Sequence, residues 1–281
     1  MTEANQPAGG ASHETSLVVR LADTEANVRA HPTHAGHRWE LFQLLCVLGQ
    51  WERAIQQLQI CTQQQPDQAA MAHACRDLIR AERSRTKVFA GEQRPGFLFE
   101  PLPWVDGLID ALRLTAQGEI DSADRVREAA LDAAKIVRAR SPQAEAEWIS
   151  DSDSRLGPVC EFITAGHYRW LALADIARWQ VERPATLLEL IWAPCTLTLH
   201  DGSTVRGFLP ARYPASAQDD DALRLGRQTV WREVGRTAVI GMGRKTWTTS
   251  AGDFSVFELA SCEFSPGVEG PTLKDETHAA G

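Results

Sequence analysis

Residues 38–54 read RWELFQLLCVLGQWERA, and this stretch decides the fold of the first half of the chain. The apolar side chains between Trp39 and Leu48 recur with a period near 3.6 residues, which is typical of one helix face. The pair Gly49-Gln50 ends this helix, and a second apolar stripe starts at Trp51. That stripe stops before Pro66, because proline disfavours helix in the residue that precedes it. The stretch therefore predicts two consecutive helices joined by a tight turn.

A repeat extends this pattern along the chain. Pro32 and Pro66 are 34 residues apart, and the residues from 35 to 68 carry the glycine, alanine and proline offsets of a tetratricopeptide unit. The same glycine and alanine spacing returns from Gly118, 69 residues after Gly49. Residues 16–140 are therefore predicted to form tetratricopeptide-like helical repeats. An ordinary helical bundle with coincidental spacing is the alternative.

The second half changes character. Residues 148–161 suggest a polar loop that leads into a short helix, and two further short helices are expected near 173–181 and 185–191. Strands then dominate, with hairpins at Asp201-Gly202, between 196–200 and 203–209, and at Gly252-Asp253, which leads into 254–264. Further strands are predicted at the ranges 223–234, 237–240 and 245–249.

The fold class predicted is α+β, with an all-α repeat region followed by a smaller α+β domain whose sheet is mostly antiparallel. We expect this second domain to cover residues 141–265. Residues 1–15 and 266–281 are rich in small, polar and charged side chains, and we expect both to be flexible tails.

Composition excludes several classes of protein. The 29 basic and 37 acidic side chains give a formal net charge of −8, which disfavours binding to nucleic acid or to an anionic membrane. No apolar run is long enough to span a bilayer, and the first residues lack the pattern of a secretory signal. Six cysteines without a C-x-x-C pair are typical of reduced thiols, so a cytoplasmic location is expected.

Residues 151–161 form the densest polar cluster. Asp151 and Asp153 could hold a cation or act as an acid and base, which would make the chain a hydrolase or a small-ligand-binding protein. The structural interpretation is favoured: both carboxylates accept hydrogen bonds from backbone N–H groups in the turn. Arg155 would then pair with one of them or with Glu161, so these four residues are predicted to join the two halves of the chain.

Other possible sites are weaker. His31, His34 and His37 share a spacing of three, but Pro32 and Gly36 interrupt the segment, so no metal site is predicted. A turn is expected at 241–245 rather than a phosphate-binding loop. Cys160 and Cys195 lie among apolar residues and are expected to be inert. We predict no catalytic residue and no cofactor.

Four sequence blocks together resemble the ImpE/TagJ family, also called SciE, of bacterial type VI secretion accessory proteins. They are residues 38–54, SDSDSRLGPVCEFITAGHYRW at 150–170, PARYP at 210–214 and LRLGRQTVW at 223–231. The blocks occur in family order, and the resemblance extends from about residue 16 to 265. The chain departs from the family pattern at Arg244-Lys245, where members commonly carry Gln-Arg.

The resemblance implies a non-enzymatic cytoplasmic adaptor. Some members bind the N-terminal helix of the small contractile-sheath subunit and are linked through it to sheath assembly, or to recycling by the sheath-disassembling AAA+ ATPase. Repeat helices form grooves suited to an amphipathic helix. On the first quoted helix, Arg38, Leu41, Leu44 and Leu48 are predicted to contact such a partner.

Overall fold

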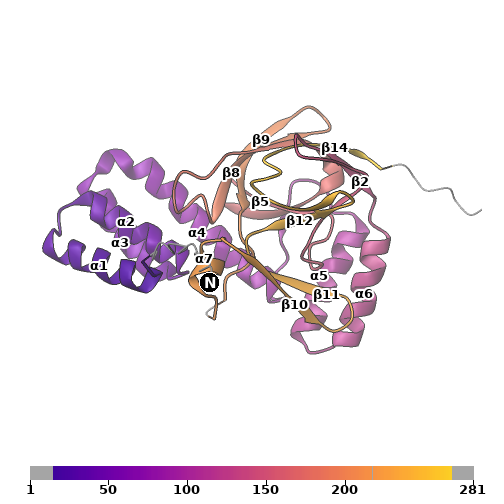
Figure 1. Ribbon diagram of the computed structural model, residues 1–281, viewed down its shortest axis with the longest axis horizontal. Coiled ribbons are helices and arrows are strands. Elements are labelled where there is room, and N and C mark those ends of the chain that lie inside the picture. The colour runs from indigo at the N-terminus through magenta and orange to yellow at the C-terminus, as the bar shows by residue number, and fades with distance from the viewer. Residues whose placement is uncertain (1–14, 217, 268–281) are drawn as a thin grey trace, which may run out of the picture.

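The computed structural model describes residues 15–216 and 218–267. A helical region comes first, followed by a mostly antiparallel sheet region, so the predicted α+β class is confirmed (Figure 1). The helices of the first region are α1 (Leu17–Ala30), α2 (Ala35–Val47), α3 (Trp51–Gln64), α4 (Ala69–Phe89), α5 (Pro103–Ala116) and α6 (Ile120–Asp132).

The quoted stretch forms the hairpin of α2 and α3. Gly49 connects the two helices with a φ of 70°, a left-handed conformation that glycine adopts without steric cost. Ala54 of α3 is fully buried. Its small side chain lets α2 and α3 approach each other closely. A second hairpin, α5–α6, has the same design, with the buried Ala123 at the matching position.

The two hairpins do not stack into one superhelix. Figure 1 shows α1–α3 at one end of the molecule and α5–α6 at the other, beneath the sheet, with the long helix α4 leading from one to the other. The segment after α4 is not another repeat helix but the short strand β1 (Gly96–Phe97), which joins the sheet. The helices described in this region therefore form two hairpins that lie apart rather than one continuous stack of repeats.

The main sheet has nine strands in the order β1-β6-β5-β9-β8-β7-β14-β2-β3. The pairing of β1 with β6 is parallel, and the other pairings described within it are antiparallel. Its remaining bounds are β2 (Val137–Arg140), β3 (Glu145–Ala146), β5 (Val159–Thr164), β6 (His167–Ala172), β7 (Ile176–Val181), β8 (Trp192–Leu199), β9 (Thr204–Pro210) and β14 (Ser261–Pro266). The helical region thus ends at Asp132, and residues 137–140 already belong to the sheet.

Strand β5 explains one failure of the sequence analysis. Val159 and Ile163 pack into the core shared with the helices, whereas Cys160 and Phe162 pack into the core on the opposite side of the sheet. A strand buried on both faces is a continuous apolar run without period-two alternation. The short helix expected to follow the 148–161 loop is therefore absent, and strands lie there instead.

Two other helix predictions were wrong. Residues 173–181 form one 3-10 turn, Leu173–Asp175, and then strand β7, while residues 185–191 contain turns and no helix. The strand expected at 223–234 begins only at Thr229, after the short helix α7 (Asp221–Arg224). The hairpin at Asp201-Gly202 is confirmed, with β8 and β9 paired on either side of it.

Two smaller sheets complete the fold. One contains β13 (Gly252–Ser255), β12 (Thr246–Thr249) and β4 (Ile149–Asp151), and the other is a ribbon of β10 (Thr229–Val234) and β11 (Ala238–Gly243). In Figure 1 this ribbon runs from α7 towards α6. Its turn is attached to α6 because Asp124 accepts hydrogen bonds from the backbone N–H groups of Arg236 and Thr237, at 2.7 and 3.1 Å.

No helix in the described ranges has the length and apolar character required to cross a membrane. The tails predicted at 1–15 and 266–281 lie almost entirely outside the described residues, although Pro266 is the last residue of β14.

Candidate functional site

The turn that follows β4 has the structure expected for a polar turn. The Oδ1 atom of Asp151 accepts from the backbone N–H of Asp153 at 2.9 Å, and the Oδ1 atom of Asp153 accepts from that of Arg155 at 3.0 Å. The guanidinium of Arg155 also binds the Asp153 carboxylate through Nε and Nη2, at 2.9 and 2.5 Å. Both aspartates are buried, so neither presents a carboxylate to solvent.

Glu161 of β5 is the centre of a buried charge cluster. Its carboxylate accepts from Nε of Arg85 at 2.6 Å, from Nζ of Lys245 at 2.7 Å and from the hydroxyl of Tyr168 at 2.7 Å. Lys245 also lies 2.5 Å from Oδ2 of Asp151. The four predicted residues therefore lie in one polar region, and Arg85 of α4 attaches that region to the helices.

The charges of this cluster stabilise one another. Burial alone would raise the pKa of Glu161, but Arg85 and Lys245 hold it well below its usual value. Burial alone would lower the pKa of Lys245, but Asp151 and Glu161 together raise it. Burial raises the pKa of Asp151 to about 6, although Lys245 opposes this shift. A cluster held in this way has the character of a structural ion network.

Sequence analysis did not identify Arg85, Lys245 and Arg212 as part of this region. Arg85 lies seven residues after Leu78 and three before Val88, on the buried face of α4. This helical spacing in the sequence could have indicated that the arginine is buried. Arg212, in the PARYP block, donates to the backbone carbonyls of Val47 at 2.9 Å and Cys46 at 3.4 Å, where a cation also complements the C-terminal end of the α2 dipole.

The predicted partner-binding residues of α2 are largely core residues. Leu41 and Leu44 are 3% and 0% exposed, because α1 and α3 pack on either side of α2. The expectation that these two leucines face a partner is therefore corrected. Arg38 and Leu48 are partly exposed, and their contact with a partner stays a prediction.

The end of α2 is also covered by the protein's own chain. Arg224 of α7 donates to the carbonyl of Leu48 at 3.2 Å, and the Asp221 carboxylate accepts from the N–H of Leu17 at 2.8 Å. Leu225 is buried in the same core as the α1–α3 helices. A partner helix cannot lie across this end of the hairpin without displacing the α7 segment.

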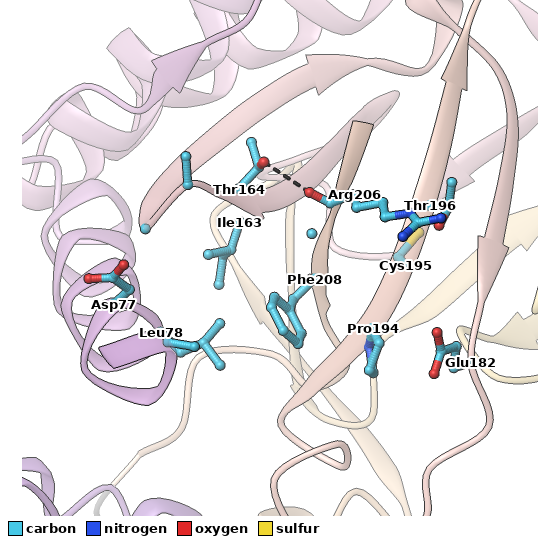
Figure 2. Close-up of a pocket in the computed structure, with 14 residues that line it drawn as sticks. Asp77, Leu78, Ile163, Thr164, Glu182, Pro194, Cys195, Thr196, Arg206 and Phe208 are labelled. Atoms are coloured by element: carbon cyan, nitrogen blue, oxygen red, sulfur yellow. Dashed lines mark hydrogen bonds between the residues drawn. The ribbon is translucent and has the colours of Figure 1, made fainter. Parts of the chain in front are cut away.

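An open groove lies instead between α4 and the sheet, and it is here called the α4 groove (Figure 2). Its volume is about 570 Å³. The partly exposed Phe208 and Pro194 supply apolar surface, the largely buried Leu78 and Ile163 also line the groove, and charged side chains lie around it. The residues that line it are Ala74, Asp77, Leu78, Ile163, Thr164, Ala165, Gly166, Glu182, Pro194, Cys195, Thr196, Arg206, Gly207 and Phe208.

The pairing of β5 with β9 forms part of the wall of the α4 groove. Their described register joins Ile163 to Phe208. At Gly207 a Cβ atom would lie 2.2 Å from the carbonyl oxygen of Ile163, so this close crossing requires glycine. Figure 2 shows Asp77 and Leu78 on the helix facing Phe208 and Pro194 on the strands.

Two polar side chains of the α4 groove have partners within the chain. The hydroxyl of Thr164 donates to the carbonyl of Arg206 at 3.0 Å, and Asp77 is ion-paired with Arg80. Burial raises the pKa of Cys195 to about 12, so its thiol is protonated at neutral pH and is a poor nucleophile.

The histidine and cysteine side chains lie apart from any metal-like grouping in the described ranges. In the part of the chain that the structure describes, no three His, Cys, Asp or Glu side chains are grouped as a metal site would require. His34 instead accepts a hydrogen bond from the N–H of His37 at 3.3 Å at the start of α2. Cys160, like Cys195, is buried, and burial raises the pKa of its thiol.

Comparisons with known proteins agree with the sequence blocks. A family profile described as "ImpE protein" matches residues 143–263. The type VI secretion system accessory component TagJ of Pseudomonas aeruginosa PAO1 is 39% identical over 247 residues, which cover 88% of this chain and 86% of that protein. The crystal structure of protein VPA1032 from Vibrio parahaemolyticus has the same fold, with a TM-score of 0.82 at 22% identity, covering 90% of this chain and 95% of that one. The chain therefore belongs to the ImpE/TagJ family of type VI secretion accessory proteins.

Proposed function

We propose that this chain is a non-enzymatic cytoplasmic adaptor that binds the N-terminal helix of the small contractile-sheath subunit of a type VI secretion system. Through that subunit it influences sheath assembly or recycling, and it is linked indirectly to the sheath-disassembling AAA+ ATPase. Membership of a family of secretion accessory proteins supports partners within this system. The observation that carries the proposal is the α4 groove, which has apolar side chains at its centre and charges around them.

The size of the groove suits one face of a helix. A single helical turn, taken as a cylinder of about 11 Å diameter and 5.4 Å length, occupies about 500 Å³. The groove of about 570 Å³ therefore does not enclose a whole helix, but it accepts apolar side chains from successive turns of one face. The partly exposed Phe208 and Pro194 would contact those side chains, and the exposed Glu182 and Arg206 would meet polar side chains at their edges.

The alternative function, a hydrolase or ligand-binding protein that uses Asp151 and Asp153, lacks support. Both carboxylates are buried and accept the hydrogen bonds of their own turn. An acid or base must reach the substrate to transfer a proton, and these groups do not reach solvent.

A pull-down tests the proposal. The full chain is immobilised and exposed to the small sheath subunit, either intact or without its N-terminal helix. We expect retention of the intact subunit and loss of the truncated one; equal retention of both would remove the proposal.

Two substitutions in the α4 groove, one charge reversal and one truncation, test the position of the site. Glu182→Arg and Phe208→Ala are expected to reduce retention of the intact subunit. Glu233→Arg is the matched control, because Glu233 is an exposed carboxylate on β10, away from the groove. If both groove variants retain the subunit as the control does, the helix binds elsewhere.

A further inference from the structure

A second recess, here called the arginine recess, lies on the other side of the β5–β6 turn. It has a volume of about 390 Å³ and is lined by basic side chains from three parts of the fold. Arg80 comes from α4, Arg94 from the segment before β1, and His167 and Arg169 from β6. No residue lining it in the described part of the chain is acidic.

Such a recess is unusual in a chain with a net charge of −8. Two of its arginines have carboxylate partners that do not line the recess: Arg80 pairs with Asp77, and Arg94 pairs with Asp106. Arg169 has no carboxylate within ion-pair distance among the described residues. Its Nη1 donates to the carbonyl of Phe97 at 2.7 Å, and its buried Nε lacks a hydrogen-bond partner. The recess therefore keeps an unneutralised positive charge.

Arg94 and Arg169 lie at the β1 edge of the sheet, whereas Arg80 lies on α4. Strand β1 pairs with β6 so that Gly96 lies opposite Arg169. Phe97 belongs to β1, and the guanidinium of Arg94 lies 5.9 Å from the centre of its ring. This contact restricts the position of the Arg94 side chain. Preorganised guanidinium groups lose less freedom when they bind an anion.

We propose that the arginine recess binds the carboxylates of an acidic peptide segment from a partner protein. Arg80 and Arg94 already bind carboxylates within this chain, and the planar guanidinium fork matches that group. Their side chains are 65% and 56% exposed, and the cations come from separate elements. This arrangement suits several carboxylates spaced along a chain rather than one enclosed phosphate. The proposal does not depend on helix binding in the α4 groove.

Titration calorimetry of the intact protein tests this proposal directly. The probe is a synthetic peptide of alternating Glu and Gly residues, compared with a peptide of alternating Lys and Gly, with inorganic phosphate and with a single-stranded oligonucleotide of equal charge. We expect the acidic peptide to bind most tightly of the four probes. Its affinity should fall as the salt concentration is raised, because salt screens the charges.

Variants locate the binding. Arg94→Gln and Arg169→Gln should each weaken binding of the acidic peptide about three- to tenfold. Arg140→Gln is the control, because Arg140 is an exposed arginine that pairs with Glu145 elsewhere on the sheet. Unchanged affinity in both recess variants, no binding of the acidic peptide, or equal binding of phosphate or the oligonucleotide would each overturn the proposal. Because Arg169 is partly buried, the exposed Arg94 keeps the test valid if Arg169→Gln folds poorly.

Discussion

Arg85 of α4 and Glu161 of β5 form a two-pronged ion pair, with 2.6 Å between Nε and Oε1 and 3.0 Å between Nη2 and Oε2, and both side chains are excluded from solvent. The pair joins the helical region to the centre of the sheet across 76 residues of sequence. Lys245, between β11 and β12, binds the same carboxylate, so the position of Glu161 depends on contacts with α4 and with this segment. A buried charge of this kind is costly unless all its partners remain.

Removal of Arg85 should therefore be severe. Arg85→Met leaves Glu161 with fewer partners in the core, and we expect the free energy of unfolding to fall by about 3–5 kcal/mol. Urea denaturation measures this change. Arg83→Met is the control, since Arg83 pairs with the exposed Glu52 at the surface and should change stability by about 0–1 kcal/mol. Equal losses of unfolding free energy in the two variants would show that the buried pair stabilises the fold no more than the surface pair does.

Asp124 should make stability depend on acid. Hydrogen bonds from the backbone N–H of Arg236 and from the hydroxyl of Thr237 lower its pKa to about 2, from a usual value of 3.8. The charged carboxylate therefore favours the folded state above about pH 4, and this stabilisation is lost as the pH falls towards 2. Asp124→Asn should cost about 1–2 kcal/mol at pH 7, and the difference from the wild type should shrink in acid.

Urea denaturation between pH 3 and pH 7 checks this dependence. Asp121→Asn on the same helix is the control, because Asp121 is exposed, and it should alter stability little at any pH. A cost of Asp124→Asn that is the same at pH 3 and pH 7 would contradict the assignment.

Arg155→Ala should lower stability without abolishing partner binding. The guanidinium binds Asp153 and lies 4.5 Å from the centre of the Phe89 ring on α4, so its loss leaves a buried carboxylate with fewer donors. We expect a cost of about 1–3 kcal/mol in urea denaturation, with the sheath subunit still retained in the pull-down. A variant that is as stable as the wild type but no longer binds would mean that this turn contacts the partner.

Leu44→Ala tests the corrected role of α2. Because Leu44 is fully buried, truncation should cost about 2–5 kcal/mol, through lost burial and a residual cavity. Leu48→Ala, at a partly exposed position, should cost less. If the folded Leu44→Ala protein retains the partner as the wild type does, Leu44 is a core residue only. Selective loss of binding at unchanged stability would restore it as a contact.

Local patterns in the sequence were sufficient for some elements. The stripe around Phe42 and the glycine at 49 predicted the α2–α3 hairpin, because helix period and turn chemistry are properties of neighbouring residues. The pair Asp201-Gly202 predicted the β8–β9 hairpin for the same reason. The turn at Asp151 and Asp153 was also predicted, since short carboxylates bind backbone N–H groups one or two residues away.

The sequence by itself thus determined the helix hairpins, the strand hairpin, the α+β class and the family resemblance. Only the tertiary structure decided that Leu41 and Leu44 are buried, that β5 is a strand covered on both faces, and that Arg85 and Lys245 meet at Glu161. The physical reason is range: hydrogen-bonded turns and helix faces depend on residues a few positions apart. Burial, ion pairs and grooves depend instead on segments that come together only when the chain is packed.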